Sequence, residues 1–224
     1  MIIGKLIGFK DISMWKTIRI NFKLCKWKVA RKFPIIVSRN VLFNNLKGNA
    51  EFRSCITPGI VRIGFNSVQV FDKKLSRTVL NVSREGRMIF MGKCSIGSGS
   101  KLGVGGVLTF GDNFTMTAES VVICSKEVKF GENNMVSWNC QIMDTDFHDI
   151  ISDNSGETLN SPSSIIFGDR VWIGSRATVL KGTILPDDTI VAACSLVTGK
   201  YSDSNTVLAG VPAKVIKRYV HRRI

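Results

Sequence analysis

The sequence of 224 residues lacks any run of about 18 apolar residues, the length that a membrane-spanning helix needs. It begins MIIGKLIGF and then turns basic, without the small-residue cleavage site that follows the apolar region of a secretory signal. Charged residues make up only 21%, and apolar residues make up 44%. These values are ordinary for a globular protein. We expect one domain with an appendage, made and kept in the cytosol.

The cysteines are scattered and lack any close pairing. None of the six cysteines forms a CxxC pair, which excludes an obvious disulfide or zinc framework. The pattern predicts small buried apolar residues in a reducing compartment. The cysteines are Cys25, Cys55, Cys94, Cys124, Cys140 and Cys194.

The net charge of +14 is concentrated at the two ends of the chain. Residues 1–54 carry 12 Lys/Arg against two acids, and residues 214–224 carry five against none. Residues 55–213 between them carry 14 against 15. The body is therefore neutral. The basic ends are either simply solvated or used for binding, and the sequence leaves both open.

An apolar residue recurs every six positions over much of the chain. The clearest series is Phe167, Ile173, Val179, Leu185, Val191 and Val197. Each of the first five is followed four positions later by a smaller residue, namely Val171, Ala177, Thr183, Thr189 and Ser195. Shorter series start at Phe90, Phe110 and Phe130. A period of six fits neither a helix nor a long strand, so it predicts a short strand and a corner, repeated.

Three such units make a triangular coil of about 18 residues, and stacked coils pair as parallel strands about 4.8 Å apart. The apolar residue then points inward and stacks on the one 18 positions later, as Phe167 on Leu185. Glycine, Asn and Asp are expected at the corners because they adopt a positive φ easily. These residues are Gly97, Gly103, Gly111, Asp112, Asn113, Gly131, Gly168, Asp169 and Gly174. The stretch GSGSKLGVGG (97–106) fits these corners and lacks the GK[ST] of a phosphate loop.

The first part of the chain departs from the repeat. Residues 11–31 predict a helix with Trp15, Ile18, Phe22 and Val29 on one face, although residues 18–24 also alternate like a strand. Pro34 ends either element. We expect a basic amphipathic extension over 1–34, a β-helix over 35–206 with an ejected loop at 147–165, and a basic tail over 207–224. Residues 35–89 are expected to form the first, looser coils of this β-helix.

Three motifs stand in order along the chain: MDTDFHDI (143–150), IIFGDRVWIGSRATVLKGTILPDDTIVAACSLVTG (165–199) and VLAGVPAKVIK (207–217). They resemble the hexapeptide-repeat acyltransferases, and most closely the bacterial capsule and lipopolysaccharide O-acetyltransferases. The resemblance implies an all-β fold, a left-handed parallel β-helix. It also implies transfer of an acetyl group from acetyl-CoA to a hydroxyl of a sugar or polysaccharide acceptor, without a metal. A homotrimer with its sites between neighbouring prisms is implied as well.

His148 lies six residues after Ile142, where the next inward residue is expected, and there the repeat breaks for about 18 residues. Such a loop on a rigid scaffold commonly carries a site. The resemblance makes His148 the general base that takes the proton of the acceptor hydroxyl during direct attack on the thioester. Asp144 and Asp146 are near enough in sequence to orient the imidazole or bind the sugar, and the sequence does not decide between them.

The remaining site residues come from the resemblance alone. Trp172 is expected to shape the site beside the histidine, and Ser175 to face the thioester. The family's Thr-Lys-Asp/Glu reads Thr198-Gly199-Lys200 here, so the lysine is displaced by one position. The positions expected to bind the cofactor are Ser175, Ser195, Thr198, Lys200, Lys214 and Lys217.

Other functions fit the sequence less well. Zinc lyases on the same prism need three histidine ligands, and the chain has only two histidines. Surface-binding β-helices show regular outward arrays of Thr or charge, which are absent. An N-acetyltransferase acting on an amino group of a nucleotide-sugar is the closest alternative, and a panel of hydroxyl and amine acceptors distinguishes it.

Residues 1–32 combine nine basic residues with Phe9, Trp15, Phe22 and Trp27 against one acid, Asp11. This mixture suits an anionic membrane surface at the inner face of the membrane, each exposed Lys/Arg adding about 1 kcal/mol of attraction. The alternative is a cap on the open end of the prism. One segment can do both. Nucleic acid is not expected as a partner, because the neutral repeat offers no recognition element.

Overall fold

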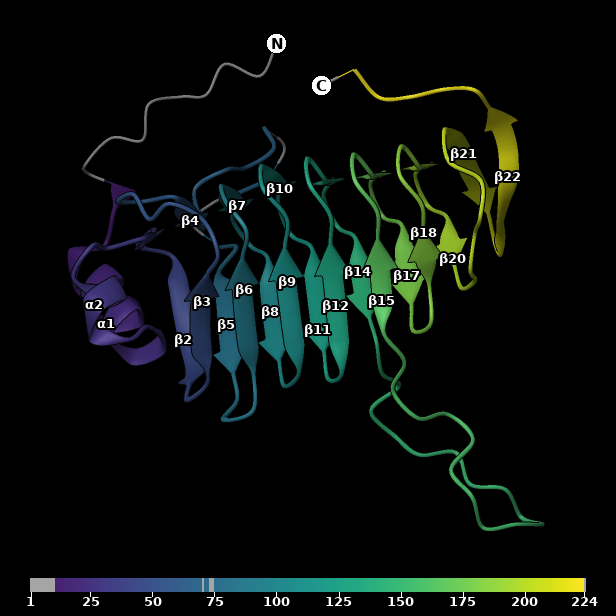
Figure 1. Ribbon diagram of the computed structural model, residues 1–224, viewed down its shortest axis with the longest axis horizontal. Coiled ribbons are helices and arrows are strands. Elements are labelled where there is room, and N and C mark those ends of the chain that lie inside the picture. Colours follow the sequence, from purple (N-terminus) through teal and green to yellow (C-terminus); the bar gives the residue numbers. More distant parts are fainter. Residues whose placement is uncertain (1–10, 70, 73–74, 224) are drawn as a thin grey trace.

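The computed structural model describes residues 11–69, 71–72 and 75–223. Within these residues, short strands form three sheets that are the walls of a triangular prism (Figure 1). From β1 to β21, consecutive strands belong to different sheets, and strands one coil apart pair with each other. No helix in this part of the chain is both long and apolar enough to cross a membrane.

Each wall is a stack of strands, and all pairings are parallel except that between β21 and β22. The nine-stranded sheet contains β1 (Ile35–Val37), β4 (Val61–Ile63), β7 (Cys94–Ile96), β10 (Phe114–Met116), β13 (Met135–Val136), β16 (Trp172–Ile173), β19 (Ile190–Val191), β21 (Thr206–Gly210) and β22 (Ala213–Arg218). The seven-stranded sheet contains β2 (Val41–Leu46), β5 (Thr78–Val82), β8 (Lys101–Val104), β11 (Val121–Cys124), β14 (Gln141–Met143), β17 (Thr178–Leu180) and β20 (Leu196–Val197). The six-stranded sheet contains β3 (Asn49–Phe52), β6 (Arg87–Phe90), β9 (Val107–Phe110), β12 (Glu127–Phe130), β15 (Ile165–Phe167) and β18 (Ile184–Leu185).

The predicted stacking of inward residues is confirmed. Phe167 pairs with Leu185, and Ile173 pairs with Val191 in the next wall. In the six-stranded sheet, Phe110 stacks on Phe130 at a ring-centroid distance of 5.8 Å, and Phe130 stacks on Phe167 at 4.6 Å. The smaller residues four positions after each apolar residue are buried, as expected for tight corners. The core is thus a column of side chains along the prism axis.

The expected reason for the corner glycines was wrong at several positions. Gly111, Gly131 and Gly168 do not adopt a positive φ. A Cβ on Gly111 would lie 2.1 Å from the carbonyl oxygen of Gly131 in the next coil, so the glycine is needed for close approach. The positive φ falls two residues later, at Asn113 (56°), Asn133 (57°) and Arg170 (58°).

The N-terminal part of the described chain forms α1 (Met14–Leu24) and α2 (Trp27–Ala30), which cover one end of the prism (Figure 1). Thr17, Ile20, Asn21 and Leu24 are the buried residues of α1. The amide of Asn21 donates to the carbonyl of Ile35 at 2.7 Å and its oxygen accepts from Ile35 N–H at 3.2 Å. These bonds satisfy backbone groups of β1, the first strand, which has no coil before it. α1 therefore caps the open end.

The cysteines are all free, but their expected burial holds only in part. Cys94, Cys124 and Cys140 are buried, and burial raises the pKa of Cys140 to about 11. Cys55 and Cys194 are exposed, so the expectation was wrong for them. Cys194 occupies a corner with a φ of 59°, where the backbone geometry turns the side chain away from the core.

Candidate active site

The chain leaves the prism between β14 and β15, at the corner between the seven-stranded and six-stranded sheets (Figure 1). This ejected loop occupies residues 144–164, where 147–165 was expected. It runs out and back as a narrow excursion, with a bridge between Ile151 and Thr158. His148 stands exposed on its outgoing arm. The break in the six-residue period thus marks a real interruption of the coil.

The base of the ejected loop is held by three side chains. The Lys181 ammonium donates to the Asp146 carboxylate at 2.5 Å and to the Asn160 carbonyl at 2.5 Å. The Asn160 amide donates to the Asp146 carboxylate at 2.9 Å and to the His148 carbonyl at 2.8 Å. Hydrogen bonds from Lys181 and then Asn160 hold the pKa of Asp146 below its usual value. The outgoing and returning arms are therefore tied to each other and to the following coil.

Asp144 was expected to orient the His148 imidazole or bind the sugar, but the structure places it elsewhere. Its side chain is fully buried and accepts hydrogen bonds from the backbone N–H groups of Ser125, Lys126 and Glu127, at 2.7, 2.7 and 2.8 Å. These groups form the turn between β11 and β12. Both oxygens of the carboxylate are thus occupied in holding the preceding coil, and neither orients His148.

The backbone of His148 is fixed, while its imidazole is open. The His148 N–H donates to the Asp146 carbonyl at 2.8 Å, and the Asn160 amide holds its own carbonyl. No hydrogen bond joins the imidazole to another residue of the described chain, and Asp146 is engaged by Lys181 and Asn160. Either ring nitrogen is therefore available to a ligand or to a neighbouring chain.

Trp172 lies in another wall. It belongs to β16 in the nine-stranded sheet, and its indole N–H donates to the Ser137 hydroxyl at 3.0 Å. In a triangular prism, the corner between two walls lies opposite the third wall. The ejected loop and Trp172 are consequently on opposite sides of one chain, and a single chain does not bring His148 and Trp172 together.

The serines predicted to bind the cofactor sit at the corner between the nine-stranded and seven-stranded sheets. Ser175 follows β16 and its carbonyl accepts from Cys194 N–H at 3.0 Å. Ser195 is buried, and its hydroxyl accepts from Gly210 N–H at 3.3 Å. The Ser195 side chain therefore faces β21 and not the solvent.

Thr198 and Lys200 are exposed and follow β20, at the corner where the ejected loop leaves the prism two coils earlier. Lys200 forms a parallel bridge with Ile184. Lys181, at the intervening coil, lies between these residues and the loop along the same corner. The structure thus separates Thr198 and Lys200 from Trp172 and places them on the side of His148.

Lys214 and Lys217 share one face of β22 because of a bulge. In a regular strand, residues three apart point to opposite faces. Here the register shifts, so that Lys214 is opposite Ala209 and Lys217 is opposite Val207, while Leu208 between them is buried. Both lysines are therefore on the outward face of the nine-stranded sheet, exposed.

Trp172 and Lys217 are in one row across that wall. Trp172 is opposite Ile190, Ile190 is opposite Val207, and Val207 is opposite Lys217. Three strand spacings separate the ends of the row, which is about 14 Å. The outer face of the nine-stranded sheet thus carries an aromatic ring at one end of the row and two cations at the other.

Part of the sequence is similar to known O-acetyltransferases. The chain is 34% identical over 127 residues to WbbJ of Escherichia coli K12, named as an O-acetyl transferase of lipopolysaccharide biosynthesis, with 52% of this chain and 63% of WbbJ covered. It is 32% identical over 89 residues to the polysialic acid O-acetyltransferase of Neisseria meningitidis, covering 40% of this chain and 39% of that protein. The chain thus spans less than two thirds of the length of these relatives. No model of a protein family matches the sequence.

The crystal structure of the polySia specific acetyltransferase NeuO shares the fold, with a TM-score of 0.51 at 17% identity over 83% of this chain and 89% of NeuO. The chain is thus similar in sequence to O-acetyltransferases over about half of its length, and it shares the fold of NeuO. Its prism is accordingly a left-handed β-helix, an exception to the right-handed rule for parallel crossovers.

Two residues of the candidate site were missed from the sequence, Asn160 and Lys181. Both contact the Asp146 side chain, from the returning arm of the loop and from the next coil. Asn160 was one polar residue among many in a stretch rich in Ser, Asn and Asp, and Lys181 lies 35 residues from Asp146. Only the folded corner brings them together.

Proposed function

We propose that this chain is an O-acetyltransferase that moves an acetyl group from acetyl-CoA to a hydroxyl of a sugar or polysaccharide. The observation that carries the proposal is that the His148 imidazole makes no hydrogen bond within the described chain, while hydrogen bonds hold the base of its loop in place. Because the backbone is fixed at both the N–H and the carbonyl, the ring is presented from a defined point. An imidazole has its pKa near working pH and suits proton removal from a hydroxyl.

His148 acts as the general base. It takes the proton as the acceptor oxygen attacks the thioester carbonyl directly, and the thiol of CoA leaves. No covalent acyl-enzyme is needed, which agrees with the buried, weakly acidic thiols of Cys124 and Cys140. Asp146 acts indirectly, by holding the loop through Lys181.

The donor lies along the outer face of the nine-stranded sheet. Lys214 and Lys217 bind phosphate groups as point charges, and the indole of Trp172 packs beside the acyl end. The separation of about 14 Å across three strand spacings leaves room for an extended chain between them. Ser175 supplies a polar group near the thioester. Thr198 and Lys200 lie at the corner that carries the ejected loop, and so on the side of the site that His148 occupies.

The active site is shared between two chains of a homotrimer. One chain cannot supply both His148 and Trp172, because they are on opposite sides of its prism. A neighbouring prism that sets its nine-stranded sheet against the loop corner completes the site. Cyclic symmetry then generates three equal sites.

The acceptor is a hydroxyl of a glycan of the capsule or O-antigen kind. The names of WbbJ and of the meningococcal protein, which refer to lipopolysaccharide biosynthesis and polysialic acid, support this class of acceptor. A nucleotide-sugar amine remains the alternative acceptor.

The test is a panel of soluble sugars with free hydroxyl or free amino groups, incubated with acetyl-CoA while thiol release is followed. Hydroxyl acceptors are expected to release thiol and give an ester that mild base removes. A base-stable product formed only with amino sugars would replace the proposal with N-acetylation. Absence of thiol release beyond hydrolysis with every acceptor would contradict acetyl transfer.

A further inference from the structure

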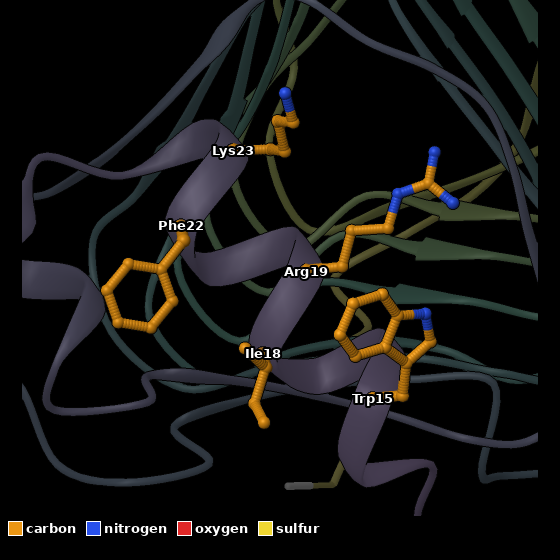
Figure 2. Close-up of a pocket in the computed structure, with 5 residues that line it drawn as sticks. All are labelled: Trp15, Ile18, Arg19, Phe22 and Lys23. Atoms are coloured by element: carbon orange, nitrogen blue, oxygen red, sulfur yellow. The ribbon is translucent and has the colours of Figure 1, made fainter.

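Helix α1 has two apolar stripes, and only one of them packs on the prism. The buried stripe contains Ile20 and Leu24, with Thr17 and Asn21. Trp15, Ile18 and Phe22 form the second stripe and are 72%, 38% and 39% exposed. At about 100° per residue, the second stripe lies nearly opposite the first. Figure 2 shows its side chains projecting from α1, with the strands of the prism behind the helix.

The exposed stripe continues into α2. The Phe22 ring lies 5.2 Å from that of Trp27 and 6.1 Å from that of Phe33. Trp27 is 67% exposed. The backbone of Phe33 has a φ of 48°, a left-handed conformation that costs energy in a bulky residue. We call these five aromatic and aliphatic residues the cap face: Trp15, Ile18, Phe22, Trp27 and Phe33.

Positive charge surrounds the cap face. Six exposed basic residues stand on the same two helices and the turn that follows: Arg19, Lys23, Lys26, Lys28, Arg31 and Lys32. No acidic residue occurs anywhere between residues 12 and 50. Lys16 differs from the six, because its ammonium donates to the carbonyls of Arg39 and Val41 on the prism.

We propose that the cap face docks on the surface of an anionic lipid bilayer. Tryptophan and phenylalanine enter the boundary between headgroups and acyl chains, and surrounding lysines and arginines meet the anionic headgroups. A second copy of the chain does not suit this face, because two cap faces in contact would bring twelve cations together, and residues 12–50 contain no acid to neutralise them.

Docking at the capped end would stand the prism on the bilayer. The ejected loop begins beside β15, which is four strand spacings from β3 in the six-stranded sheet. This is about 19 Å along the prism axis. If the proposed function is right, a glycan attached to a lipid carrier would be modified some distance from the bilayer, at sugars remote from the lipid.

The test is sedimentation of the full chain with sucrose-loaded vesicles of phosphatidylcholine, alone or with about 30% phosphatidylglycerol. We expect at least tenfold stronger partitioning to the anionic vesicles at low salt, and a marked loss at high salt. Arg19→Glu with Lys23→Glu should abolish it. Trp15→Ser with Phe22→Ser should weaken it at all salt concentrations. Arg84→Glu with Lys93→Glu makes the same charge change on exposed residues of the prism body and should have little effect.

Equal partitioning to both vesicles, or an equal loss in the Arg84 and Lys93 variant, would overturn the proposal. Concentration-dependent association of the protein that Trp15→Ser with Phe22→Ser removes, without vesicle binding, would assign the face to a second copy. Circular dichroism and thermal unfolding confirm that each variant folds. Acetyl transfer to a soluble acceptor without vesicles should be unchanged in all of them, so membrane docking and catalysis fail or succeed separately.

Discussion

The carboxylate of Asp146 and the ammonium of Lys181 meet at 2.5 Å across 35 residues of sequence. Asp146 belongs to the outgoing arm of the ejected loop, and Lys181 belongs to the corner after β17. The pair therefore fixes the loop to the following coil, in addition to its two covalent connections to β14 and β15. Because Asn160 joins the same carboxylate from the returning arm, one ionised group organises the whole loop base.

Removal of this ion pair should loosen the loop without unfolding the prism. In Lys181→Met, we expect the Ile150 N–H, which donates to the Asn160 side chain, to lose protection from hydrogen exchange at every pH. In the wild type the pKa of Asp146 is lowered, so the tether is complete above the usual Asp range near 4 and is lost only as pH falls below it. Lys126→Met, at the same corner two coils before Lys181, is the control. Unchanged protection of Ile150 in Lys181→Met would contradict the tether.

His148→Ala should reduce turnover by about 10²–10⁴-fold while leaving the fold and CoA affinity nearly unchanged. Its side chain makes no hydrogen bond within the described chain, so its loss leaves no buried group unpaired. His221→Ala, which removes the other histidine, is the control and should retain most activity. Near wild-type acetyl transfer by His148→Ala would exclude the general-base mechanism.

Asp144→Ala should lower the stability of the fold, and any loss of activity should follow from that. It leaves three backbone N–H groups of the turn between β11 and β12 without an acceptor. An unpaired buried donor costs about 1–3 kcal/mol, and water can reach these three donors in part because their bonds are only partly buried, so we expect a total loss of about 3 kcal/mol in the free energy of unfolding. Urea unfolding measures it, with Asp153→Ala, an exposed residue of the loop, as the control. A stable but inactive Asp144→Ala would instead place Asp144 in the catalytic site.

The sequence predicted the prism because its signal is repeated: each inward residue, such as Phe167 or Ile173, follows from the last by counting six. It predicted the position of the loop because the count fails at His148. The sequence could not predict the contacts of Asp144 and Asp146. They depend on which backbone N–H groups the turn after β11 exposes and on which side chains of the next coil reach the loop. The same holds for α1, where two apolar stripes were available and the register of hydrogen bonds to β1 selected one.

The bulge in β22 makes a prediction about donor binding. Lys214 and Lys217 face the same side only because the register shifts between Val207 and Leu208. Lys214→Ala with Lys217→Ala should raise the Kd of CoA about tenfold or more, and the wild-type affinity should fall with salt. Dephospho-CoA should lose less if one lysine meets the 3′-phosphate. The control is Lys101→Ala with Lys129→Ala on the other walls. An unchanged Kd in the Lys214 and Lys217 variant would reassign the basic tail.

The site shared between chains can be tested by mixing two inactive variants. His148→Ala lacks the base and Trp172→Ala lacks the aromatic wall, so each homotrimer should be nearly inactive. When the two are unfolded together in equal amounts and refolded, each site draws its loop from one chain and its nine-stranded sheet from the next. About one site in four then combines an intact His148 with an intact Trp172, so roughly a quarter of wild-type activity should return. Mixing the folded trimers without subunit exchange is the control and should restore nothing. If both residues came from one chain, every site in the refolded mixture would carry a defect, and no activity would return.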